Sequence, residues 1–142
     1  MAASDANSHI PYDAVTLLIG VNNQFQGRDT AEYRTQFAEC LNKAVFFSGN
    51  KKTHVFVVSI PDWSVTPFGA TYGPAQVAAA IDRFNAINKE ITDGMGIAYV
   101  NITPVSRQND PTLIAGDALH PSGKQYGLWA QLLAPVMERQ LR

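Results

Sequence analysis

Three short apolar segments, separated by stretches of helical character, constrain the fold of this chain most strongly. They run from Ala14 to Ile19, from His54 to Ile60 and from Ile97 to Ile102, and each is rich in residues that favour strands. Nearly unbroken apolar runs of this length are typical of parallel strands buried on both faces. The alternation therefore predicts an α/β fold, specifically a flavodoxin-like, three-layer α/β/α arrangement of three βα units around a parallel sheet.

The segments between and after these strands carry apolar side chains at helical spacing. Helices are predicted over residues 30–47, over residues 74–91 with Asp93-Gly94 as the stop, and from Pro121 onward. The side chains expected to form their apolar faces are Tyr33, Phe37, Leu41 and Val45; Val77, Ile81, Phe84, Ile87 and Ile91; and Tyr126, Trp129, Leu132, Leu133 and Val136. A chain of 142 residues fits one domain, predicted over residues 12–142 behind a polar tail at 1–11.

Composition narrows the classes of partner. Eleven basic and twelve acidic residues give a net charge of -1 without a block of either sign, so nucleic acid is not an expected partner. No segment is long and apolar enough to predict a membrane span, and the polar start lacks the features of a signal peptide. The protein is therefore expected in the cytoplasm by default, or to be secreted if a leader peptide has been lost from the sequence. Cys40, the single cysteine, is expected to be a small buried residue.

A ligand site is expected in the loops that follow the strands, because parallel sheets bind ligands at the carboxyl ends of their strands. These loops are predicted at residues 20–27, 61–71 and 103–120. Trp63 and Phe68 lie in the second loop and Tyr72 directly follows it. These three side chains could line an acyl or sugar pocket or simply pack together. Asp62 could join Asp117 and His120 at a metal, but without a further spaced ligand no metal site is predicted.

The third loop ends in Asp117 and His120, three residues apart. An imidazole can take a proton from a hydroxyl near neutral pH, and a nearby carboxylate fixes its tautomer and stabilises the imidazolium. For an Asp-x-x-His pair alone, a surface histidine beside an aspartate that caps a helix is the commoner arrangement. Asn22 in the first loop favours the catalytic interpretation, because an amide N–H₂ beside a strand end can stabilise an oxyanion. An asparagine there can also simply form the turn.

These segments resemble two sequence blocks of the SGNH (GDSL) hydrolase family. Gly20-Val21-Asn22-Asn23 is similar to the block written GxND, and the DALHP sequence at 117–121 to the block written DxxHP. The similarity extends through residues 59–63 and 126–130. The resemblance implies an esterase or acylhydrolase that cleaves acyl esters with Ser, His and Asp and needs no cofactor. The resemblance also implies that Asp117 and His120 are catalytic residues and that Asn22 and Gly20 contribute to the oxyanion hole.

The family's Gly-Asp-Ser block, which supplies the nucleophile, has no counterpart in this sequence, so the nucleophile is unknown. Ser64 is the best placed substitute but lacks a strained nucleophile turn, while Ser59 is expected in a strand and Ser122 at the start of the last helix. The missing portion of a complete fold would be a βαβ unit of at least about 30 residues. The sequence is therefore expected to be the C-terminal part of the fold.

Two functions follow from this interpretation. The first is a serine esterase whose nucleophile-bearing segment is missing, so that this chain is inactive alone. The alternative is a non-catalytic domain that binds a small ester, a glycan or a partner. In either case the Ala14 to Ile19 strand is expected to have an uncharged, unpaired outer edge, which predicts self-association through that edge.

Overall fold

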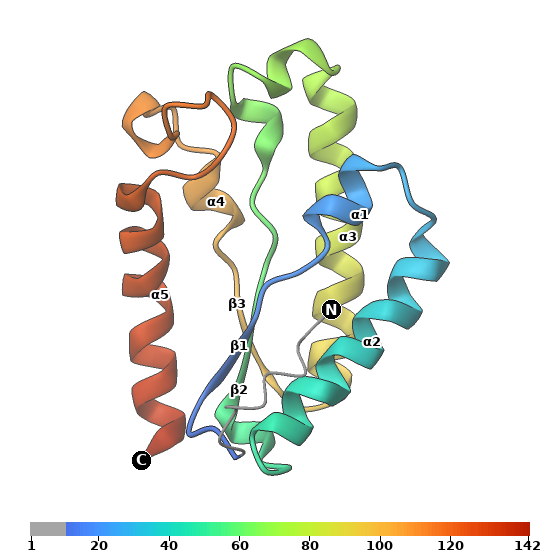
Figure 1. Ribbon diagram of the computed structural model, residues 1–142, viewed down its shortest axis with the longest axis vertical. Helices are drawn as coiled ribbons and strands as arrows, with labels where there is room; N and C mark the ends of the chain where they lie inside the picture. The colour runs from blue at the N-terminus through green and yellow to red at the C-terminus, as the bar shows by residue number, and fades with distance from the viewer. Residues whose placement is uncertain (1–10) are drawn as a thin grey trace.

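A three-stranded parallel sheet lies at the centre of the computed structural model, which describes residues 11–142. Its strands are β1 (Val15–Leu17), β2 (Val55–Val58) and β3 (Ala98–Val100), in the spatial order β1-β2-β3 (Figure 1). Both pairings are parallel, with Val15 opposite Val55 and Phe56 opposite Ala98. All three predicted strands are confirmed, although each ladder is shorter than the apolar run that predicted it.

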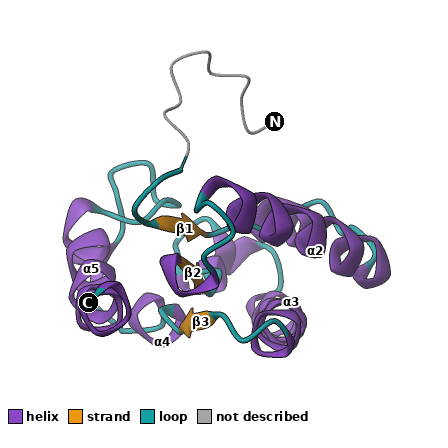
Figure 2. Ribbon diagram, turned by 90° about the horizontal axis from the view of Figure 1, so that it is seen from below, coloured by secondary structure: helices purple, strands orange, loops and turns teal. Residues whose placement is uncertain are grey.

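Helices cover both faces of this sheet, as Figure 2 shows in a view along the strands. The helices α2 (Thr30–Phe47) and α3 (Pro74–Gly94) lie on one side, and α4 (Thr103–Ser106) and α5 (Gly123–Leu141) lie on the other. A further short helix, α1 (Val21–Phe25), is the first helix after β1. The predicted α/β/α layering is confirmed. The predicted tail at residues 1–11 falls almost wholly outside the described residues.

The larger core lies between the sheet and the α2/α3 pair. Tyr33, Phe37 and Leu41 of α2 are almost completely buried there, and α2 begins where the Asp29 carboxylate accepts hydrogen bonds from two backbone N–H groups. The helix α3 continues past its predicted end. Gly94 is its last residue, and Gly96, with a φ of 68°, lies just beyond the C-cap residue Met95. Cys40 is only partly buried, contrary to expectation.

The start of α5 differs from the prediction. Ser122 is the N-cap residue, its hydroxyl accepting a hydrogen bond from the Gln125 N–H, and Pro121 instead forms an isolated bridge with Ile114. The predicted apolar face is also only partly correct. Trp129 is buried in a smaller core with Val58 and Val100, whereas Tyr126 and Leu132 are exposed. Within residues 11–142, no helix has the length and apolar content to cross a bilayer.

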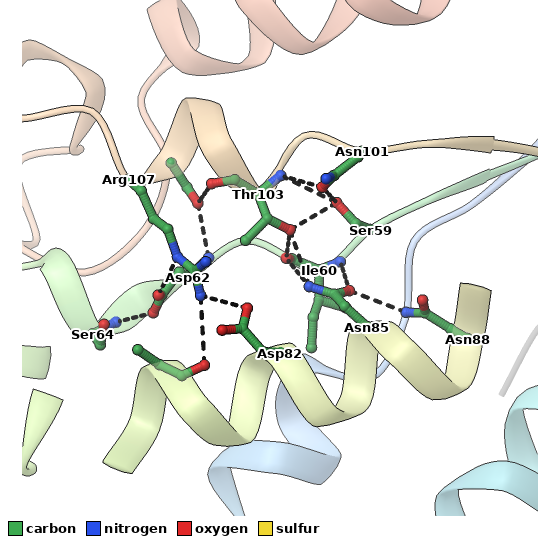
Figure 3. A network of polar contacts seen from close by, with 12 residues as sticks. Ser59, Ile60, Asp62, Ser64, Asp82, Asn85, Asn88, Asn101, Thr103 and Arg107 are labelled. Carbon is green, nitrogen blue, oxygen red and sulfur yellow. Dashed lines mark hydrogen bonds and ion pairs between the residues drawn. The ribbon is translucent and has the colours of Figure 1, made fainter. Parts of the chain in front are cut away.

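A buried polar network fastens the carboxyl ends of β2 and β3 to each other and to α3 (Figure 3). Ser59, fully buried just after β2, accepts hydrogen bonds from the Ile102 and Thr103 N–H groups. On the other side the Asn85 side chain accepts from the Ile60 N–H at 2.8 Å and donates to the Ile60 carbonyl at 3.1 Å. The Asn85 side chain therefore pairs with both backbone groups of Ile60, as a neighbouring strand would. The chain can then leave the sheet at Ile60 without leaving these groups unpaired.

The outer edge of β1 generates the first prediction. Among the described residues β1 pairs only with β2, and Thr16, at its centre, is exposed and uncharged. We expect the protein to associate increasingly with concentration, because an unprotected strand edge is a template for pairing with another chain. Light scattering coupled to size-exclusion chromatography measures this. Thr16→Lys should shift the population toward monomer, whereas Thr35→Lys on the exposed face of α2 should not; a protein that stays monomeric at every concentration contradicts the prediction.

Candidate active site

A cavity of about 270 Å³ opens at the carboxyl ends of the strands. Five parts of the chain form its walls: the end of β1 with α1, the loop after β2, the end of α4 at Ser106, residues 114–121, and the first turns of α5. Most of the lining side chains are apolar or aromatic. Asn22 and His120, nearly one hundred residues apart in the sequence, both line this cavity.

The Asp117 carboxylate organises the loop that carries the histidine. One oxygen, Oδ1, accepts hydrogen bonds from the Leu119 and His120 backbone N–H groups, at 3.0 and 2.9 Å. The other, Oδ2, lies 2.6 Å from His120 Nδ1. Ala118, between them, has a φ of 65°, and its carbonyl accepts the Phe68 N–H at 3.1 Å. An Nδ1–H that donates to Asp117 leaves Nε2 as the basic atom of the ring.

The same contacts keep Asp117 ionised. The backbone N–H of His120, then that of Leu119, then the His120 side chain lower the pKa of Asp117 to about 2. Both partners are nevertheless open to solvent, with exposed fractions of 71% for the His120 side chain and 51% for that of Asp117. The pair is thus a preformed, charged and accessible unit at the mouth of the cavity.

The two residues predicted for the oxyanion hole occupy different environments. Asn22, in the first turn of α1, is exposed and lines the cavity. Gly20 does not line it. A Cβ at Gly20 would lie 2.5 Å from the Tyr33 hydroxyl, which donates to the Ile19 carbonyl, and the φ of Gly20 is 124°. Glycine is therefore required at position 20 by close packing against α2.

The three candidate nucleophiles, Ser59, Ser64 and Ser122, make hydrogen bonds to groups other than the His120 ring. Ser59 is buried in the network of Figure 3, and the Ser122 hydroxyl donates to the Thr112 carbonyl while capping α5. Ser64 is buried in a 3₁₀ turn (Trp63–Val65), where its N–H donates to Asp62. The predicted place of Ser59 in a strand is wrong, because β2 ends at Val58 and Ser59 is the residue after it. Within residues 11–142 no serine hydroxyl is hydrogen-bonded to His120.

Asp62 belongs to a structural ion pair. Its side chain is only 1% exposed, and Oδ2 accepts a hydrogen bond from Arg107 Nε at 2.8 Å. Arg107 also contacts Asp82 at 2.7 Å, and the Asp62 N–H donates to Ser106 Oγ (Figure 3). These contacts fix the loop that forms one wall of the cavity. In the described part of the chain, no three His, Cys, Asp or Glu side chains are grouped as a metal site would require.

The aromatic residues in and next to the second loop divide between the two predicted uses. Trp63 lines the cavity, and its indole N–H donates to Gln24 Oε1 at 2.6 Å. Phe68 and Tyr72 pack against each other with ring centroids 4.9 Å apart and lie outside the lining. Sequence reasoning missed the rest of the aromatic wall. Phe25 meets Trp63 edge to face at 5.3 Å, and the position of Phe25 depends on α1, which was predicted as loop.

Comparison with known proteins defines the class. The model of the GDSL-like Lipase/Acylhydrolase family matches residues 2–128, and the chain therefore belongs to this family. Among solved structures, one described as a "putative acylhydrolase" from Bacteroides fragilis superposes with a TM-score of 0.64 at 15% sequence identity. The match covers 91% of this chain and 63% of that one, which establishes a shared fold. No curated protein sequence matches this chain.

The hydrogen bonds to Asp117 predict its titration. Its carboxylate should remain ionised down to a pH of about 2. The stability that the ionised carboxylate gives to the loop should be complete above the ordinary carboxyl pKa and should be lost as the pH falls through about 2. Carboxyl ¹³C NMR over an acid titration measures this. In His120→Ala the pKa of Asp117 should rise but stay below its ordinary value, because both backbone donors remain. A return to the ordinary value contradicts this description of the turn.

Proposed function

We propose that the cavity is an acyl ester site in which Asp117 and His120 provide acid–base chemistry and Asn22 stabilises the oxyanion. Asp117 holds His120 with Nε2 as the base. Nε2 takes the proton of an attacking serine hydroxyl as the serine oxygen bonds to the ester carbonyl, and returns that proton to the departing alcohol. Water then releases the acyl group by the same steps. The Asn22 amide N–H₂ would donate to the carbonyl oxygen as it becomes negative.

One observation supports this proposal above the others. The 2.6 Å contact between His120 Nδ1 and Asp117 belongs to a histidine that lines the same cavity as Asn22. Membership of an acylhydrolase family adds the class of reaction. A surface histidine beside an aspartate that caps a helix would not need to line an apolar cavity together with Asn22. The shared cavity therefore favours the catalytic interpretation.

A second candidate function is a domain that binds an ester, a glycan or a partner without cleaving it. It is favoured by the serines of residues 11–142, none of which is hydrogen-bonded to His120. We therefore propose that this chain alone binds the ester and hydrolyses it poorly. The Ser-His-Asp reaction would then require a nucleophile supplied from outside the described residues.

The experiment is a hydrolysis assay of the purified chain with a short-chain nitrophenyl ester. We expect turnover close to background, because one oxyanion donor is worth about 10²–10³ in rate and a triad nucleophile about 10⁶. His120→Ala and His54→Ala form a matched pair, since His54 lies next to the amino-terminal end of β2. Ordinary enzymatic turnover that is lost in His120→Ala and retained in His54→Ala would show a nucleophile within this chain and overturn the proposed inactivity.

A further inference from the structure

Two side chains in the wall of the cavity carry buried polar atoms that have no hydrogen-bond partner among the described residues. The atoms are Gln125 Oε1 and Trp129 Nε1, and both residues line the cavity. Gln125 is 4% exposed and Trp129 is 7% exposed. The two residues are four positions apart in α5, so they lie on the same face of the helix. Buried polar groups are rarely left unpaired, so two of them in one cavity wall indicate that a polar ligand group binds there.

The hydrogen bond of Gln125 determines which end of its amide is free. Its Nε2 donates to the Leu113 carbonyl at 2.9 Å, which leaves the oxygen as the unpaired end. An amide oxygen only accepts hydrogen bonds, and the indole N–H of Trp129 only donates. The wall therefore holds one free acceptor and one free donor, one helical turn apart. A hydroxyl group both donates and accepts, so a single hydroxyl can pair with both atoms.

The other buried polar side chains of the lining are already paired within the protein. Trp63, the second tryptophan of the wall, donates its indole N–H to Gln24 at 2.6 Å. Asp62, Thr66 and Ser106 likewise bond to groups of the protein. The two unpaired atoms of α5 are therefore exceptions in a wall whose buried polar groups are otherwise paired.

We propose that Gln125 and Trp129 form a hydroxyl subsite, where an ester bound in the cavity places a free hydroxyl group. The hydroxyl donates to Gln125 Oε1 and accepts from the Trp129 indole N–H, after a small rotation of these side chains toward the cavity. This inference rests on the proposed function and narrows its substrates to hydroxylated esters. An ester without the hydroxyl would leave both buried atoms unpaired, and the site would discriminate against it for that reason.

Three unreactive amide analogues measure this preference on the purified chain. N-ethylbutanamide has no hydroxyl, N-ethyl-3-hydroxybutanamide has one on the acyl side, and N-(2-hydroxyethyl)butanamide has one on the side of the alcohol. One of the two hydroxylated analogues should bind about tenfold more tightly than N-ethylbutanamide, and its identity shows which side of the ester carries the hydroxyl. Equal affinity for all three analogues, or no binding of any, would overturn the inference.

The NMR signals of the two indole N–H groups locate the contact. In the free protein the Trp129 N–H should resonate upfield of the Trp63 N–H, which is hydrogen-bonded to Gln24. The preferred analogue should move the Trp129 N–H downfield, with a smaller change at Trp63. The ring centroid of Tyr126 lies 4.7 Å from that of Trp129. A Trp129 signal that does not respond would show that its N–H already faces this ring, and would overturn the subsite.

Trp129→Phe and Trp63→Phe form a matched pair of variants. Trp129→Phe removes the free donor, so the tenfold preference should be lost, whereas Trp63→Phe removes a donor that is already paired with Gln24 and should retain the preference. Equal losses in the two variants would contradict the assignment to Trp129. His120→Ala should retain the preference, because the subsite does not use the acid–base pair.

The Asn22 side-chain amide and the His120 ring report on the proposed function in the same titrations. An analogue that binds without shifting either signal would contradict the proposed function and this inference together. Binding that shifts both signals but shows no preference for a hydroxyl would contradict the subsite alone.

Discussion

The fastening of β2 to β3 just beyond their last paired residues is the constraint on which the site depends. Ser59 accepts the Ile102 and Thr103 N–H groups, while Asn85 from α3 pairs with both backbone groups of Ile60 (Figure 3). Buried backbone groups left unpaired would cost about 1–3 kcal/mol each. Because they are paired, the chain can turn out of the sheet at a fixed point. The loops after β2 and β3 therefore start side by side, and the cavity forms between them.

The second level of order lies within those loops. The buried Asp62–Arg107 pair fixes the wall that carries Trp63, and the turn at Asp117 fixes His120. Both arrangements use a carboxylate that accepts backbone N–H groups, so the geometry of each is set before a ligand arrives. The difference is exposure. Asp62 is enclosed and serves the fold, whereas Asp117 and His120 reach solvent and are available for chemistry.

Much of this fold could be predicted because its main elements repeat a simple period. The buried stripes of α2 and α3 extend over several turns, and β2 is apolar throughout, so periodicity identified them. The helices α1 and α4 have only five and four residues, too few to show a period, and were predicted as loops. In the site, the Asp117–His120 contact followed from local spacing. The contacts of Asn85 with Ile60 and of Arg107 with Asp62 join residues 25 and 45 positions apart, which no local pattern signals.

The central claim is that Asn22 and His120 act on one bound acyl ester. An NMR titration with an unreactive amide analogue of a short-chain ester tests it directly, by following the Asn22 side-chain amide and the His120 ring together. The account predicts that both signals shift with one dissociation constant, while the side-chain amide of Asn42, exposed on α2, does not respond. Signals from Asn22 and His120 that titrate separately, or a ligand that shifts neither, would contradict it.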